Sequence, residues 1–81
     1  MQKYITWNEI NYTAKRFSWS VLDKGNVKTY RRQNIYVKVT KVYSGYKILI
    51  YKNNNIINNE VLNNENLTKL LLWEYLTVVK Y

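Results

Sequence analysis

The amino-acid sequence predicts an α+β fold: a short N-terminal helix, three to four antiparallel strands, and a C-terminal helix packed on one face of the sheet. Three observations predict it. A helix-capping motif opens the chain, segments of alternating polarity fill its middle, and a leucine-rich amphipathic segment closes it. Its 81 residues have the size of a single compact domain, residues 1–81, with one small core.

The first predicted element is a helix that begins after Thr6. Thr6 and Glu9 have the spacing of a capping box, and Ile5 and Ile10 take the two positions of a hydrophobic staple. One stripe of helical period follows, made of Trp7, Ile10, Ala14 and Phe17. A strand over residues 5–12, which are rich in Tyr, Ile and Thr, is the competing interpretation, and the helix is preferred.

A hairpin follows, because apolar residues alternate with serine over residues 17–21. Asp23–Gly25 can form a three-residue loop that pairs Val21 with Val27. A four-residue loop would instead pair Val21 with Lys28 and place a lysine on the apolar face. The three-residue loop is therefore preferred.

A second hairpin is predicted after the polar cluster 31–34, which marks a turn or a strong bend. Apolar and polar residues alternate strictly over residues 35–40, as in a half-buried strand. Ser44–Gly45 can form a two-residue loop that pairs Tyr43 with Tyr46. In this register a core side and a solvent side separate cleanly.

The asparagine-rich stretch 53–66 has two interpretations. Asn53–Asn54 can close one more hairpin, because Asn tolerates the left-handed backbone of tight turns, and residues 56–61 would then form an edge strand. The whole stretch can equally be a loop.

The C-terminal helix is capped by Asn64 or Asn66 and is expected to run to about Lys80. Its apolar residues cover an arc wider than the usual stripe: Leu67, Leu71, Leu72, Tyr75, Leu76, Val78 and Val79. This helix should cover the apolar side of the sheet and leave the other face open. The three tryptophans, Trp7, Trp19 and Trp73, are expected in the core.

Composition argues against an enzyme. The chain has no Cys, His or Pro, which excludes disulfides, Cys/His zinc sites and any imidazole base, and no cofactor is expected. Its few carboxylates form no convincing acid–base or metal-binding pair. The chain has neither a signal-peptide core nor a membrane-spanning run, so a cytoplasmic location is expected.

The charge points towards an anionic partner. The formal net charge is +8, and residues 1–52 hold eleven basic residues against two acidic ones. Abundant Lys, Asn, Tyr and Ile are typical of a low-GC genome, but codon bias gives no reason for cations to gather in one part of the chain. The uneven distribution of the basic residues is therefore stronger evidence for an anionic partner than their number.

The open sheet face is the candidate site. The predicted registers place these residues on it: Ser18, Ser20, Lys28, Tyr30, Arg32, Tyr36, Lys38, Thr40, Lys47, Leu49 and Tyr51. Tyrosines among cations suit single-stranded nucleic acid, because bases stack on the rings while Lys and Arg neutralise phosphates. Tyr30, Tyr36 and Tyr51 are the expected stacking platforms. The expected phosphate contacts are Arg31, Arg32, Lys38 and Lys47, and Lys28 is a further expected nucleic-acid-binding residue. Ordinary solvated strand residues are the alternative interpretation.

Two functions are therefore expected. The first is a small basic, non-catalytic module that binds nucleic acid, single-stranded in preference, or a nucleoprotein complex. The second is an inhibitor of the anti-CRISPR or anti-restriction type, which blocks a host nucleic-acid-processing enzyme mainly by protein contacts; in composition the chain resembles small proteins of phages and mobile elements. No membrane partner is expected. RNA against DNA, the partner's identity and the oligomeric state stay open.

Overall fold

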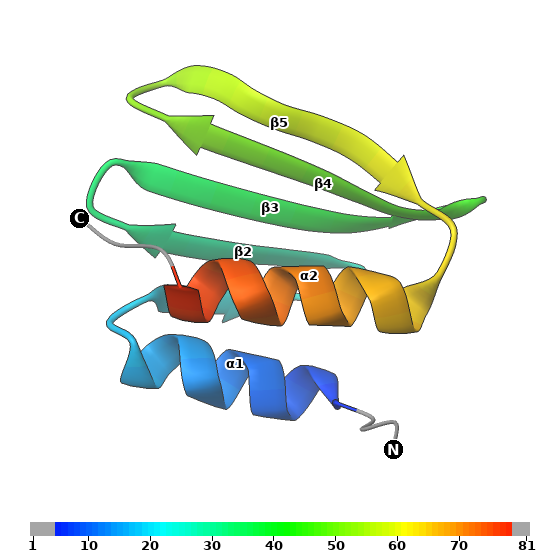
Figure 1. The fold of residues 1–81 in the computed structure, drawn as a ribbon, viewed down its shortest axis with the longest axis horizontal. Helices are drawn as coiled ribbons and strands as arrows, with labels where there is room; N and C mark the ends of the chain where they lie inside the picture. Colours follow the sequence, from blue (N-terminus) through cyan, green and yellow to red (C-terminus); the bar gives the residue numbers. More distant parts are fainter. Residues whose placement is uncertain (1–4, 79–81) are drawn as a thin grey trace.

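A computed structural model describes residues 5–78 of the chain and contains two helices and five strands within them (Figure 1). The elements in order are α1 (Trp7–Arg16), β1 (Ser20–Asp23), β2 (Val27–Arg32), β3 (Ile35–Val42), β4 (Gly45–Lys52), β5 (Asn55–Leu62) and α2 (Glu65–Val78). Each strand pairs antiparallel with its neighbour in sequence, so β1 and β5 form the two edges. The α+β class is confirmed, with one strand more than the three to four expected.

Tight turns divide the long polar and β-rich stretches into separate strands, and this division produces the fifth strand. Gln33 (φ 54°), Asn53 (φ 54°) and Asn54 (φ 67°) adopt the left-handed conformation that such turns require. The two turns are also tied together, since the Asn53 N–H donates to the Asn34 carbonyl at 3.0 Å. The 31–34 cluster thus contains a turn, as predicted, formed by Gln33 and Asn34, and the hairpin interpretation of residues 53–66 is the correct one.

The β3–β4 hairpin has a different register from the predicted one but the same faces. Val42 pairs with Gly45 and Lys41 with Tyr46, so the two-residue loop is Tyr43–Ser44 and not Ser44–Gly45. The shift amounts to two residues of pairing. Because side chains alternate with a period of two, every residue of this hairpin keeps its predicted side.

The β1–β2 hairpin is where the prediction was wrong. Asp23 pairs with Lys28 and Val21 with Tyr30, a pairing three residues away from the predicted one. The turn holds this register: the Asp23 carboxylate accepts the Gly25 N–H at 2.9 Å, and Lys28 Nζ lies 3.8 Å from that carboxylate. A shift by an odd number of residues turns the whole of β2 over relative to the predicted faces.

The N-terminal helix α1 confirms the sequence motif. Thr6 is its N-cap, and the hydrogen bonds in both directions between Thr6 and Glu9 form the capping box. At the other end Ser18 takes a left-handed φ of 71°, and the Trp19 N–H donates to the Ala14 carbonyl at 2.9 Å. Ser18 therefore belongs to the helix terminus. The prediction that it lies on the open sheet face was wrong.

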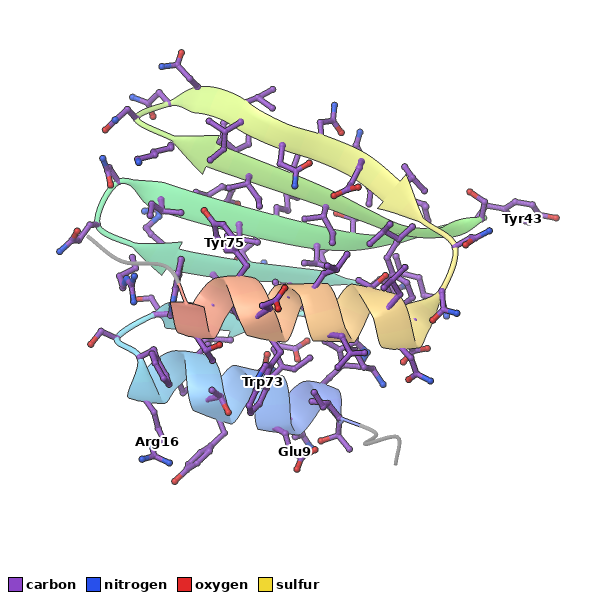
Figure 2. All side chains as sticks on the ribbon, in the orientation of Figure 1. Glu9, Arg16, Tyr43, Trp73 and Tyr75 are labelled. Carbon is purple, nitrogen blue, oxygen red and sulfur yellow. The ribbon has the colours of Figure 1, made fainter. Side chains whose placement is uncertain are left out.

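Both helices lie on the same side of the sheet (Figure 1). Between them and the sheet is one core, whose largest fully buried side chains include Ile10, Tyr30, Val37 and Leu72. Trp19 is buried as predicted, and its Nε1–H donates to the Leu76 carbonyl at 3.0 Å. Trp7 and Trp73 are half-buried against this core. In Figure 2, Trp73 points towards α1 and Tyr75 towards the sheet.

Helix α2 buries less of its surface than its apolar arc predicted. Asn64 caps it by accepting the Leu67 N–H at 2.9 Å, and Leu72 and Leu76 are buried. Leu67 and Leu71, expected against the sheet, are 45% and 38% exposed. The predicted end near Lys80 lies outside the described residues. Within residues 5–78 neither helix is long and apolar enough to cross a membrane.

Candidate nucleic-acid interface

The sheet surface that faces away from both helices is called the open face here. Strand alternation and the pairing registers place the following residues on it: Ser20, Leu22, Val27, Thr29, Arg31, Tyr36, Lys38, Thr40, Val42, Lys47, Leu49, Tyr51, Ile56, Asn59 and Val61. Five of the eight predicted site residues are among them: Arg31, Tyr36, Lys38, Lys47 and Tyr51. The fold thus assembles part of the predicted site on one surface.

Four of these five surround a single hollow of about 460 Å³. Arg31, Tyr36, Lys38 and Tyr51 supply two cations and two phenol rings to its lining. The β2–β3 and β4–β5 turns complete the lining with Gln33, Asn34 and Asn54, together with Ile35 at the start of β3. These two turns lie at the same end of the sheet and are tied by the Asn34–Asn53 hydrogen bonds, so the rim of the hollow is fixed by the meander itself.

The rings in the hollow form a small aromatic cluster. Tyr36 and Tyr51 are cross-strand partners with centroids 5.9 Å apart and planes tilted by 55°. The guanidinium carbon of Arg31 lies 5.3 Å from the Tyr36 centroid, within the range of a cation–π contact. Both rings are half-buried, so each retains surface that a flat ligand can contact.

Lysines continue the positive charge along the same face. Lys38 is exposed between Thr29 on β2 and Leu49 on β4. Lys47 lies one row further from the hollow, between Thr40 and Val61. The cations of the open face therefore extend from the hollow across the middle of the sheet.

No carboxylate shares this face. All five acidic residues of the chain are described, and none belongs to the open face: Glu9 lies on α1, Asp23 in the first hairpin, Glu60 on the helix side of β5, and Glu65 and Glu74 on α2. Arg31, Lys38 and Lys47 are on it, so the charged side chains of the open face are all positive. Such a surface attracts phosphate groups over distances of about a Debye length.

Tyr30 does not belong to the site, contrary to the prediction. It is fully buried on the helix side, and its hydroxyl donates to Asn11 Oδ1 at 2.7 Å. Burial, and secondarily the nearby Asp23 charge, raises the pKa of Tyr30 well above its ordinary value. Tyr30 is a core residue with a satisfied polar tip.

Lys28 and Arg32 also point towards the helices, and the prediction was wrong for both. Lys28 is 8% exposed; its Nζ donates to the Gly25 carbonyl and lies 4.5 Å from the Trp7 ring centroid. Arg32 is 6% exposed; it donates to the Phe17 carbonyl at 2.9 Å and lies 4.7 Å from the Trp19 ring centroid. The turned-over β2 buries these cations, and carbonyl and aromatic partners make their burial tolerable.

Asp23 takes part in the same arrangement. Burial alone would raise the pKa of its carboxyl, but hydrogen bonds from Gly25 and Asn11, together with the Lys28 charge, lower that pKa overall. The Asn11 amide donates to Asp23 at 2.7 Å and thereby connects α1 to the first hairpin. These contacts explain why the register departs from simple apolar alternation.

Sequence reasoning missed the turn residues that line the hollow. Gln33 and Asn34 stood out as a polar cluster, and Asn54 as a turn former, but nothing in their spacing indicated that the two turns meet. Apart from Leu49, it also missed the apolar side chains of the open face. Leu22, Ile56 and Val61 are each more than half exposed there.

Comparisons with protein-family models, with curated proteins and with solved structures gave no match to this chain. Within residues 5–78, no group of three or more acidic side chains gathers in a way that could hold a metal ion. The chemistry of the open face itself therefore carries the functional argument.

Proposed function

We propose that this protein is a non-catalytic module that binds single-stranded nucleic acid through the open face. The observation that carries the proposal is the hollow in which Arg31, Tyr36, Lys38 and Tyr51 come together. An unpaired base stacks on Tyr36 or Tyr51, and the adjacent phosphates contact Arg31 and Lys38. Lys47 contacts the strand further along its path. We propose that the protein acts in the cytoplasm.

The geometry favours single strands over duplexes. A half-buried ring that lines a hollow can be reached by a base that is free to leave its neighbours. Bases inside a duplex are stacked on each other and present only their edges. Arg31 is exposed and its guanidinium lies beside the Tyr36 ring. It can therefore contact a phosphate next to a base that stacks on this ring.

The test compares tyrosine variants in binding a fluorescent single-stranded oligonucleotide. We expect Tyr36→Ala or Tyr51→Ala to cost roughly 1–3 kcal/mol of binding free energy, the usual value of one stacked base. Tyr12 is a matched control, because it is an exposed tyrosine on α1 with Arg16 6.0 Å from its ring. Tyr12→Ala should bind as the parent does. Equal binding by all three variants would refute the proposal.

A second candidate function, the inhibitor that binds a host enzyme, is favoured by one observation. Leu22, Ile56 and Val61 expose apolar surface on the same face that carries the cations. Exposed apolar patches rimmed by polar residues mark protein interaction sites, and burial of apolar surface depends less on salt than phosphate contacts do. Binding to a host enzyme that persists unchanged at high salt would favour this second function.

A further inference from the structure

Strand β5 is an edge strand whose protection against further pairing is limited to one charged residue, Glu60, and one bulge. It runs over Asn55–Leu62, contains neither Lys nor Pro, and exposes more than half of Ile56, Ile57 and Val61. The other edge, β1, has only four residues. Soluble proteins usually shorten, charge or cover their edge strands, because unpaired N–H and C=O groups accept another chain. The one irregularity in β5 lies near Ile56, and pairing from Asn58 to Leu62 is regular.

A groove borders this strand on the helix side. It has a volume of about 440 Å³ and lies between α2 and strands β4 and β5. Its apolar lining comes from Ile48, Ile50, Leu71, Leu72 and Tyr75. Leu71 is 38% exposed there, and Figure 2 shows Tyr75 directed towards the sheet. Side chains of a strand added to β5 would alternate between this groove and the open face.

The groove is negative on a protein that is otherwise strongly positive. Glu60 of β5 and Glu74 of α2 both line it, and Asn58 is its third polar lining residue. Among the described residues the two ion pairs are Lys28–Asp23 and Lys69–Glu65, so neither groove carboxylate is neutralised by a described cation. A cationic side chain with a long apolar stem matches both the walls and the carboxylates.

We propose that β5 binds an extended segment of another protein as a sixth strand, and that this segment alternates basic and apolar residues. Its backbone pairs with β5 along Asn58–Leu62. Its Lys or Arg side chains lie along Leu71 and reach Glu60 and Glu74, while its apolar side chains cover Val61 on the open face. Backbone hydrogen bonds supply affinity in this mode and the alternating side chains supply specificity.

The experiment uses a capped synthetic peptide of about eight residues that alternates lysine and valine. A peptide of the same composition, with its lysines in one block, is the control. We expect the alternating peptide to slow hydrogen exchange of β5 amides by at least about tenfold and the block peptide not to do so. Long-range repulsion from a +8 protein opposes both peptides equally, so the difference isolates the site. Equal exchange with both peptides overturns the proposal.

Variants test the charge match separately. Glu60→Gln combined with Glu74→Gln should weaken the alternating peptide by roughly five- to tenfold, as expected for the loss of two exposed ion pairs. Lys38→Gln on the open face should leave peptide binding unchanged and weaken oligonucleotide binding, which keeps this proposal distinguishable from the proposed function. Undiminished binding by the double variant overturns the choice of a basic partner.

A second copy of the chain is the competing occupant of β5. Sedimentation of the free protein over a range of concentrations decides this point. A monomer with fast-exchanging β5 amides supports the proposal. A dimer whose β5 amides are already protected shows that the edge pairs with itself, and overturns it.

Discussion

Arg31 and Arg32 are neighbours with opposite roles. Arg31 is exposed on the open face beside Tyr36, whereas Arg32 is buried beneath the helices against Trp19. Arg32→Ala removes the donor to the Phe17 carbonyl and opens a gap at the core. We expect it to lower the free energy of unfolding by about 2–3 kcal/mol. Arg31→Ala should change stability by less than about 0.5 kcal/mol.

Binding should show the reverse order. Arg31→Ala is expected to weaken single-stranded oligonucleotide binding, and Arg32→Ala, measured under conditions in which it is folded, should bind as the parent does. Urea denaturation and fluorescence anisotropy measure the two effects. If Arg32→Ala instead lost binding while keeping its stability, the inward orientation of Arg32 would be wrong.

Tyr30 makes stability depend on alkaline pH. Its pKa is raised in the folded protein, first by burial and then by Asp23, while in the unfolded chain it stays near its ordinary value of about 10. Above that pH the unfolded state loses the proton that the folded state keeps, so stability is complete below about pH 10 and falls as pH rises. Denaturation at a series of pH values measures this fall.

Tyr30→Phe is the matching variant. It should cost about 1 kcal/mol at neutral pH, because the hydroxyl donates to Asn11. It should also make the alkaline fall shallower without abolishing it, since burial raises the pKa of Tyr46 and Tyr75 as well. An unchanged alkaline profile in Tyr30→Phe would contradict the assignment of this titration.

The elements differ in how well local sequence specifies them. The α1 cap was predictable because Thr6 and Glu9 satisfy each other's backbone within one turn. The faces of β3 and β4 were predictable because the error in register was even. The faces of β2 were not, since its register depends on contacts among Asp23, Gly25 and Lys28 that alternation does not reveal.

This difference explains which part of the site was predictable. Tyr36, Lys38, Lys47 and Tyr51 lie on the hairpin whose faces were correct. Lys28, Tyr30 and Arg32 share the strand that is turned over, and Arg31 was included for the phosphate contacts of its guanidinium and not from its parity. The arc of α2 was over-predicted for another reason: periodicity shows which residues are apolar, but not how much of the sheet the helix covers.

Gly45, the first residue of β4, allows this strand to approach the end of β5 closely. Its φ is 152°, and a Cβ there would overlap the Leu62 carbonyl oxygen and lie 2.8 Å from Asn63 Cα. These atoms are backbone and cannot move without separating the strands. We expect Gly45→Ala to lower the free energy of unfolding by about 2–3 kcal/mol, measured by urea denaturation.

Gly25 provides the comparison for Gly45. Its φ is 81°, but a Cβ there would meet nothing within 4 Å. Gly25→Ala should therefore cost only the conformational penalty of about 1–2 kcal/mol. Equal losses in the two variants would mean that the close approach of Leu62 to Gly45 does not contribute.

At the scale of the whole molecule, the sheet keeps the carboxylates away from the open face, while cations lie on both of its sides. Arg31, Lys38 and Lys47 lie on the open face without a carboxylate, while Glu60 and Glu74 line the groove on the helix side. A cation on the open face and a cation in a distant loop make the same contribution to the net charge. Only the first can contact phosphates bound at the hollow, and salt dependence distinguishes the two contributions.

If three cations contact phosphates, the logarithm of the association constant for a single strand should fall against the logarithm of salt with a slope of about −2. Binding would then weaken roughly 20-fold between about 50 and 200 mM salt. Lys38→Gln should reduce the steepness of this slope by about 0.7. Lys24→Gln, in the exposed first hairpin loop, changes the net charge equally and should leave the slope unchanged. Equal slopes for the two variants would show that net charge, and not the open face, governs binding.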